Sequence, residues 1–194
     1  WYLRELTGCW TNAISENLAA LGYVSGIGRQ RDFYSHYVRP LAVKNTRAFV
    51  IISDALRYEV AAELCDTITR TTRGKAKIEA VQAVFPSITK FGMAALLPGK
   101  KLGIDRENDS DTKVYVDDMP ARTTQEREKI LCIGNPNSIA VRYNDVLNMK
   151  RAERRKLVSG KEVVYIYHNT IDAIGDKAST ESKVFEACED SLQE

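Results

Sequence analysis

Four oxygen-bearing side chains lie at or just after apolar runs in three well-separated parts of the chain. They are Asp54, Thr89, Asp172 and Asp176. Carboxylates and hydroxyls suit hard divalent cations as ligands. A hydroxyl bound to such a cation loses its proton near neutral pH and becomes a nucleophile. The residue types are therefore compatible with metal-assisted phosphoryl transfer.

The spacing of these residues gives each of them a part in that chemistry. Thr89 stands at the start of a predicted helix over 90–97, where free backbone N–H groups also hold a phosphate. Asp172 and Asp176 are four residues apart, which brings both carboxylates to one side of a helical turn. Thr89 is therefore a candidate nucleophile, and the aspartates are candidate metal ligands.

A structural reading of the aspartates stays open. An aspartate between a strand and a helix commonly caps that helix, because its carboxylate accepts hydrogen bonds from free backbone N–H groups. On this reading the chain is a soluble α/β domain in which all three aspartates, Asp54, Asp172 and Asp176, are helix caps.

Two apolar runs set the expected sheet. The run 49–53 is continuous and rich in β-branched residues, which is typical of a central strand with helices on both faces. A second such run spans 162–167, and strand and helix patterns alternate along the chain. This order predicts an α/β fold with a parallel sheet flanked by helices. Ligands bind such sheets at the carboxyl ends of the strands, so we expect Asp54, Thr89 and Asp172 to converge there.

The remaining patterns predict the elements around that sheet. The expected helices cover 3–21, 33–38, 60–68, 90–97, 123–131, 144–158 and 178–192, and a further strand covers 78–85. Pro40 should stop the second of these helices, and Thr123 with Glu126 forms a capping box at the start of the fifth. The charged segment 103–119 predicts a loop with a brief strand at 113–116.

The predicted helix over 144–158 has a basic face. Its cations are Lys150, Arg151, Arg154, Arg155 and Lys156. Such a face is usually solvated, and the alternative is that it docks an acidic partner or a nucleic-acid backbone. The net charge of the whole chain is only +2, which argues against bulk electrostatic binding of nucleic acid as the main role.

The composition is that of an ordinary globular protein. The 194 residues are 44% hydrophobic and 28% charged, which is enough for one domain, and no apolar run is long enough to span a bilayer. The four cysteines are far apart and only two histidines occur. We therefore expect reduced thiols, a cytoplasmic protein and a metal site that depends on carboxylates. The chain starts at Trp1 without a signal-peptide pattern, and we expect it to be part of a longer protein.

Three segments carry a resemblance to a known family. They read VIISDALRYE (50–59), FPSITKFGMAALLPG (85–99) and YHNTIDAIGDKASTE (167–181), and shorter matches lie at 33–34 and 127–131. Together they resemble the PglZ domain of the alkaline-phosphatase superfamily, found in BREX phage-defence systems. The resemblance implies an alkaline-phosphatase-like core, hydrolysis of a phosphodiester or phosphomonoester, and a divalent metal, which is zinc or, as the alternative, manganese.

The roles of individual residues carry over where this sequence matches the family's pattern. The resemblance implies that Asp54 binds metal and that Thr89, in a Pro-Ser-x-Thr pattern, is both nucleophile and metal ligand. Ser87 of the same pattern is the alternative nucleophile. Asp172 corresponds to the aspartate of an Asp-x-x-x-His motif, and Asp176 stands where that motif has its histidine. His168 is either a substitute for that histidine or a structural residue.

The chain contains no Asp-His pair, which the superfamily has on a later strand. The resemblance therefore implies a helical lead-in at 1–45 and, at 46–194, the N-terminal part of a PglZ domain truncated at its C-terminus. We expect the chain as it stands to be folded, inactive and prone to self-association.

Two functions are kept as hypotheses. The first is a metal-dependent phosphohydrolase domain of a bacterial phage-defence system, acting on a phosphoester substrate for which nucleic acid and nucleotides are candidates. The alternative is a non-catalytic α/β scaffold or interaction module that binds other defence-system proteins. Neither hypothesis involves a membrane.

Overall fold

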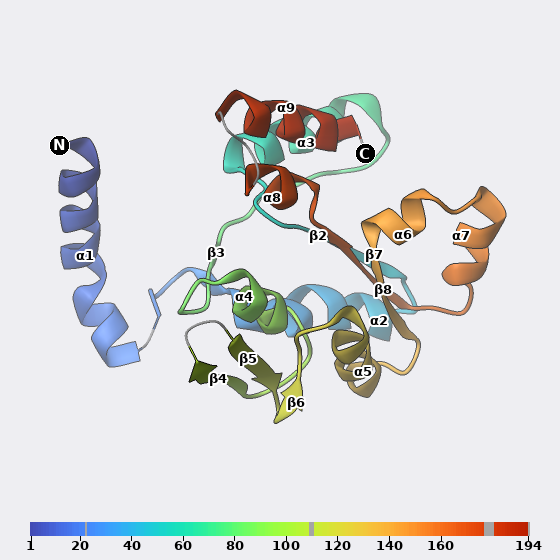
Figure 1. The fold of residues 1–194 in the computed structure, drawn as a ribbon, viewed down its shortest axis with the longest axis horizontal. Helices are drawn as coiled ribbons and strands as arrows, with labels where there is room; N and C mark the ends of the chain where they lie inside the picture. Colours follow the sequence, from blue (N-terminus) through green and yellow to red (C-terminus); the bar gives the residue numbers. More distant parts are fainter. Residues whose placement is uncertain (22, 109–110, 177–180, 194) are drawn as a thin grey trace.

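A three-stranded parallel sheet lies in the middle of the molecule (Figure 1). The computed structural model describes residues 1–21, 23–108, 111–176 and 181–193. Within them the sheet has the order β2 (Ala48–Ser53), β8 (Val163–His168) and β7 (Ser138–Arg142). Val50 of β2 pairs with Tyr165 of β8, and Tyr165 pairs with Ala140 of β7. The predicted α/β class, with parallel strands and flanking helices, is confirmed.

The central strand of this sheet is β8 and not β2. The first three residues of β8 are at most 1% exposed, whereas Phe49 and Ile51 of β2 are 54% and 67% exposed and Val50 between them is buried. The prediction that 49–53 is a central strand buried on both faces is therefore wrong for the described sheet. A run of β-branched residues favours a strand wherever it pairs, but strand order depends on distant partners that the run does not encode.

The main core lies on one face of the sheet. Helices α4 (Thr89–Ala95) and α5 (Thr124–Gly134) pack there against Val50, Tyr165 and Tyr167. The helices contribute Phe91, Ala94, Ile130 and Leu131, all nearly inaccessible to solvent. Burial of this apolar surface holds the start of α4 close to the carboxyl ends of β2 and β8.

A second, smaller core joins three helices beyond the carboxyl ends of the strands. These are α3 (Tyr58–Thr71), α8 (Thr170–Gly175) and α9 (Glu181–Gln193), which lie together on one side of the molecule in Figure 1. Val60, Ile171 and Cys188 are its buried members. The last predicted helix, over 178–192, is thus found as α9, although 178–180 lie outside the described residues.

An antiparallel unit takes the place of most of the loop predicted at 103–119. It consists of β4 (Leu102–Asn108), β5 (Asp111–Val116) and β6 (Met119–Pro120), in that order. The brief strand at 113–116 is confirmed as part of β5, but the rest of the loop prediction is wrong. An antiparallel strand needs to bury only one face, and here the buried side chains are Val114 and Val116. The charged residues between and around them made the strand pattern hard to recognise.

Two further predictions about the N-terminal half need correction. A π-helix at Tyr34–Val38 continues directly into α2 (Arg39–Val43), so Pro40 does not stop the helix. Proline is tolerated in the first turn of a helix, where its missing N–H has no partner in any case. The strand predicted at 78–85 is reduced to β3 (Val81–Gln82), which pairs in parallel with β1 (Gly28–Arg29).

The helix predicted over 144–158 is two helices, α6 (Tyr143–Leu147) and α7 (Arg151–Leu157). The second helix begins after Lys150, whose backbone N–H donates a hydrogen bond of 2.6 Å to the Glu153 carboxylate. This arrangement caps α7 at its N-terminus. The capping box of α5 is confirmed: the Thr123 hydroxyl accepts from the Glu126 N–H at 3.2 Å, and the Glu126 carboxylate accepts from the Thr123 N–H at 2.8 Å.

The first helix, α1 (Tyr2–Leu21), stands to one side of the rest of the molecule (Figure 1). Leu3, Leu6 and Trp10 on it are between 51% and 74% exposed, so the apolar face predicted for this helix is not buried at these positions. None of the helices in the described part of the chain has the length and apolar character needed to cross a bilayer.

Candidate active site

A cavity of about 520 Å³ opens at the carboxyl ends of β2 and β8. Three of the four residues singled out by the sequence line it, namely Asp54, Thr89 and Asp172. They come from the end of β2, the start of α4 and the first turn of α8. The fourth, Asp176, is the exposed C-cap of α8 and does not line the cavity. The chain thus brings together residues that are more than a hundred positions apart.

Asp54 occupies a tight turn directly after β2. Its backbone N–H donates to the carbonyl oxygen of His168 at 2.9 Å, which joins the ends of β2 and β8. The next residue, Ala55, has φ +62°, in the left-handed region that residues with a Cβ rarely adopt. The backbone therefore turns away from β2 directly after Asp54, and the Asp54 carboxylate lies at the cavity.

The pKa of Asp54 is raised above its ordinary value, first because the carboxyl group is partly buried and second because the Asp172 carboxylate lies nearby. Asp176 adds a weaker effect in the same direction, whereas the Ala55 N–H and the Arg127 charge oppose it. Two like charges held this close favour protonation or a bound cation. The Asp54–Asp172 pair is therefore the part of the cavity that suits a metal.

The donor set fits one oxygen-liganded cation in part. Asp54, Asp172 and the Thr89 hydroxyl supply oxygen atoms of the kind that Mg²⁺, Mn²⁺ and Zn²⁺ accept. Among the residues that the structure describes, however, no three His, Cys, Asp or Glu side chains are grouped closely enough to hold a metal ion. The described residues thus provide two carboxylates and a hydroxyl, and not a closed ligand cage.

Thr89 is the first residue of α4 and is exposed. Its hydroxyl makes no hydrogen bond within the described part of the chain, so it is available to a ligand. The alternative nucleophile, Ser87, lines a neighbouring hollow of about 670 Å³ together with Phe85 and Phe91, and not the cavity that holds Asp54. The two hydroxyls thus lie in different hollows.

Arg127 is a cavity residue that the sequence reasoning did not single out as part of the site. Arg127 is only 6% exposed, and its guanidinium lies 4.8 Å from the centre of the Tyr167 ring. It donates hydrogen bonds to the carbonyl oxygens of Ala121 and Arg122 and to the sulfur of Met93, at 2.9, 3.0 and 3.1 Å. No described carboxylate lies within ion-pair distance, so the hydrogen-bond partners of Arg127 are all neutral, although its charge acts to lower the pKa of the nearby Asp54.

A sequence signal for Arg127 did exist. It lies three and four residues before Ile130 and Leu131, which places it on the buried face of the predicted helix. An arginine on an apolar face is rarely buried unless it is paired. Such a position is therefore a candidate for binding an anion.

Tyr167 adds a second unusual group to the same cavity. The residue is 7% exposed, and its hydroxyl has no hydrogen-bond partner among the described residues. Burial raises the pKa of Tyr167 to about 12 against the opposing effect of the adjacent Arg127 side chain, so the hydroxyl keeps its proton at neutral pH. It can therefore donate to an oxygen atom of a ligand.

His168 has structural contacts on the strand ends. It is 5% exposed, its Nδ1 lies 2.8 Å from the Ser53 hydroxyl oxygen, and its ring packs edge-on against Tyr143 at 4.9 Å. Because its imidazole also lines the cavity, both roles considered for His168 are compatible with its position. The Nδ1 atom, however, is engaged by Ser53.

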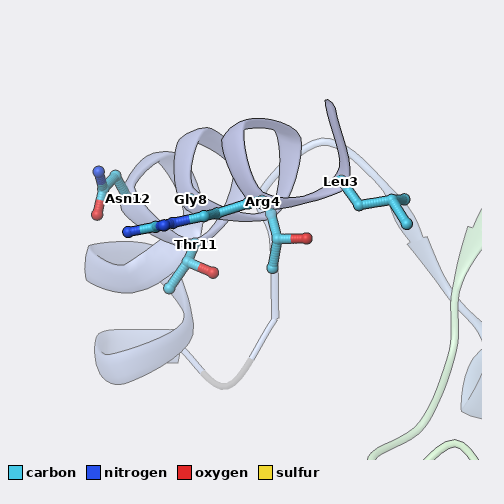
Figure 2. A pocket seen from close by; sticks show the side chains of 6 residues that line it. Leu3, Arg4, Gly8, Thr11 and Asn12 are labelled. Carbon is cyan, nitrogen blue, oxygen red and sulfur yellow. The ribbon is translucent and has the colours of Figure 1, made fainter. Parts of the chain in front are cut away.

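A further hollow, of about 550 Å³, lies along α1 alone (Figure 2). Gly8 leaves a gap on the helix surface, and the Arg4 side chain extends along it towards Thr11 and Asn12. None of the lining residues is a carboxylate, histidine or cysteine. This surface therefore has no set of groups for catalysis.

Comparison with known proteins gives consistent matches. Residues 33–194 match the family model described as the BREX system PglZ alkaline phosphatase-like domain. The chain is 41% identical over 193 residues to the alkaline phosphatase-like protein PglZ of Bacillus cereus (strain H3081.97), and 42% identical over 197 residues to the alkaline phosphatase-like protein BrxZ of Escherichia coli O9:H4 (strain HS). Each match covers 100% of this chain but 22% of the relative, so the chain spans about a fifth of the length of these relatives. No solved structure matches significantly.

Proposed function

Because this chain belongs to the PglZ family of BREX-system alkaline phosphatase-like domains, we propose that it carries the nucleophile and part of the metal site of a phosphoric ester hydrolase. The hydrolase acts within a bacterial phage-defence system, in the cytoplasm and together with other proteins of that system. One observation carries the proposal. A single cavity combines a pair of carboxylates with a hydroxyl that has no hydrogen bond, and a buried cation that has no ion pair, among the residues that the structure describes.

The hydroxyl of Thr89 is the nucleophile of the proposed reaction. The hydroxyl loses its proton to solvent and its oxygen forms a bond to the ester phosphorus, while the bond from phosphorus to the leaving oxygen breaks and the leaving oxygen takes up a proton. Water then attacks the phosphorylated Thr89, which releases the phosphoryl group and restores the hydroxyl. Asp54 and Asp172 would hold a divalent cation, zinc or manganese, which when bound lowers the pKa of a coordinated hydroxyl.

Arg127 and Tyr167 bind the non-bridging oxygens of the substrate. Arg127 supplies a fixed positive charge in a buried position, where its effect on a phosphoryl group is stronger than in water. Tyr167 supplies the proton of an otherwise unsatisfied hydroxyl. Lys90, which also lines the cavity, adds a second cation near Thr89. The three groups together favour an anionic ester over a neutral one.

The test is hydrolysis of an aryl phosphodiester and of an aryl phosphomonoester by a protein of the relatives' full length. We expect release of the aryl alcohol when zinc or manganese is present and loss of turnover after chelation. The same protein with Asp54→Asn serves as the comparison, because the amide keeps the shape of the side chain but not its charge. Turnover that is unaffected by both chelation and Asp54→Asn would exclude this site.

The alternative, a non-catalytic scaffold, has its own supporting observation. The described residues contain no group of three metal-binding side chains, and Asp176 stands in place of a histidine. On this alternative the full-length protein binds its defence-system partners without turning over either ester. Self-association of the 194-residue chain is a further expectation, because Phe49 and Ile51 expose apolar surface on the edge strand β2.

A further inference from the structure

The segment 142–161 concentrates positive charge beside the candidate active site. It holds seven Lys or Arg residues against two Asp or Glu residues, while the whole chain has a net charge of +2. The rest of the chain is therefore net negative. Residues 150–156 within this segment are all exposed. The chain thus has one strongly basic surface although its net charge is close to zero.

One of these cations holds the two helices together, and others form no contact of this kind within the described part of the chain. Arg154 donates to the carbonyl oxygens of Met149 and Leu147 at 3.0 Å each, which joins α7 to the end of α6. By contrast, Arg151, Arg155 and Lys156 form no hydrogen bond or ion pair within the described part of the chain. Arg151 and Arg155 are one helical turn apart and share a face of α7. We refer to α6 and α7 with these cations as the basic arm.

The basic arm is continuous with the cavity. Arg142, the last residue of β7, and Asn144, on α6, both line it. From there α6 and α7 project to one side of the sheet (Figure 1). After α7, Lys161 donates a hydrogen bond of 3.0 Å to the carbonyl oxygen of Ser138 in β7. This bond connects the C-terminal end of the arm to the sheet. The arm is thus anchored on β7, and its first residues line the cavity.

We propose that the basic arm binds the phosphodiester backbone of a nucleic acid, one phosphate of which occupies the cavity. This inference rests on the proposed function. The cavity of about 520 Å³ is of a size for one small phosphoester, and the exposed cations of the basic arm are placed to bind further phosphates of a longer substrate. A nucleic acid has such phosphates in succession, each of which a Lys or Arg can neutralise with release of a counterion.

A nucleic acid also fits better than an acidic protein. Arg127 and Tyr167 present a buried charge and an unsatisfied donor to the same cavity, and this pair suits a phosphoryl group. A nucleic-acid strand offers one type of group to both the cavity and the arm. An acidic peptide offers carboxylates to the arm but no phosphorus to Thr89.

The experiment measures binding of a fluorescently labelled single-stranded oligonucleotide to the 194-residue chain at several salt concentrations. Thr89→Ala is present throughout to prevent cleavage. The test variant is Arg151→Gln/Arg155→Gln/Lys156→Gln. The control, Arg70→Gln/Arg73→Gln/Lys75→Gln, removes the same charge from exposed positions in the last turn of α3 and just after it. Circular dichroism verifies that both variants fold.

Loss of three backbone contacts should reduce the slope of log affinity against log salt by about 2, and the affinity at 0.1 M salt on the order of 100-fold. We expect these changes in the arm variant and much smaller ones in the control. Equal losses in both variants, or binding of a polyglutamate peptide in preference to the oligonucleotide, would overturn the inference. Aryl phosphodiester hydrolysis by the full-length protein tests the proposed function separately, so failure of one can be told from failure of the other.

Discussion

The hydroxyl oxygen of Ser53 lies 2.8 Å from Nδ1 of His168, and the two residues are register partners at the ends of β2 and β8. The contact sits one residue before Asp54, whose own N–H donates to the His168 carbonyl oxygen. Side chain and main chain together therefore hold the end of β2 against β8. The position of the Asp54 carboxylate depends on this double connection.

Ser53→Ala should lower the free energy of unfolding by about 1 to 3 kcal/mol, because it leaves a buried imidazole nitrogen without its partner. Urea denaturation of the chain measures the change. Ser35→Ala is the matched control, since its hydroxyl donates to the Asp32 carbonyl oxygen at an exposed position. If both variants lose the same stability, the Ser53–His168 contact has no special structural importance.

Arg127→Met should reduce kcat/KM for an aryl phosphodiester on the order of 100-fold in the full-length protein, because a preorganised charge is removed from the phosphoryl oxygens. Arg127→Lys should recover only part of this loss, since lysine keeps the charge but not the planar fork. Lys129→Met, at an exposed position on α5, is the control. If Arg127→Met has the kinetics of the parent protein, Arg127 does not bind the substrate.

Thr89→Ala should lower the same activity on the order of 1,000-fold or more, because alanine has no group to form the covalent intermediate. Thr89→Ser should retain part of the activity, because the hydroxyl survives. Ser87→Ala should behave like the parent protein, since Ser87 lines the neighbouring hollow. The opposite pattern, with Ser87→Ala inactive and Thr89→Ala active, would move the nucleophile to Ser87.

The 194-residue chain should bind zinc or manganese weakly and should not turn over phosphodiesters. The described residues offer two carboxylates and a hydroxyl at the cavity, and two-metal sites need more ligands than these. Isothermal titration calorimetry of the parent chain and of Asp172→Asn measures the affinity. Tight stoichiometric binding together with turnover would show that the site is complete within these residues.

The capping box of α5 should make stability depend on pH on the acidic side. Hydrogen bonds from the backbone of Thr123 and Arg122 lower the pKa of Glu126 below its ordinary value. Its stabilising contribution is therefore complete above the unfolded-state pKa and is lost as the pH falls through the lower folded-state pKa.

Glu126→Gln keeps the cap but removes this titration, so the gap in unfolding free energy between parent and variant should close at acidic pH. Urea denaturation at pH 7 and at pH 3 provides the comparison. Thr123→Ala should cost about 1 kcal/mol at pH 7, as is usual for the loss of an N-cap. A gap between parent and Glu126→Gln that is the same at both pH values would contradict the assigned role of Glu126.

The sequence predicted the class of the fold and the convergence of Asp54, Thr89 and Asp172 because both depend on local patterns. Apolar runs identify strands, and the carboxyl ends of parallel strands lie at one edge of a sheet. The order of the strands was not predictable, because the neighbour of β2 is β8, more than a hundred residues away. The catalytic and metal-binding roles of the converging residues remain predictions.

Other features depended on contacts that leave little trace in a single segment. β4 was missed because charged residues surround it. Arg127 was visible as an arginine on the buried face of α5, but only the three-dimensional structure shows that its partners are neutral and that it faces the Asp54 cavity. The break between α6 and α7 depends on the reach of Arg154 back to two carbonyl groups.

The position of β2 at the edge of the described sheet also affects how the protein is made. In that sheet β2 pairs with β8 alone, and the partner of Ser53 lies 115 residues further along the chain. A ribosome must therefore synthesise all of the intervening segments before β2 gains its neighbour and before Asp54 and Asp172 can meet. Until then an apolar strand stays unpaired on the nascent chain. The candidate site is thus among the last parts of this chain to be assembled, and chaperones that hold unpaired strands have their longest access to it.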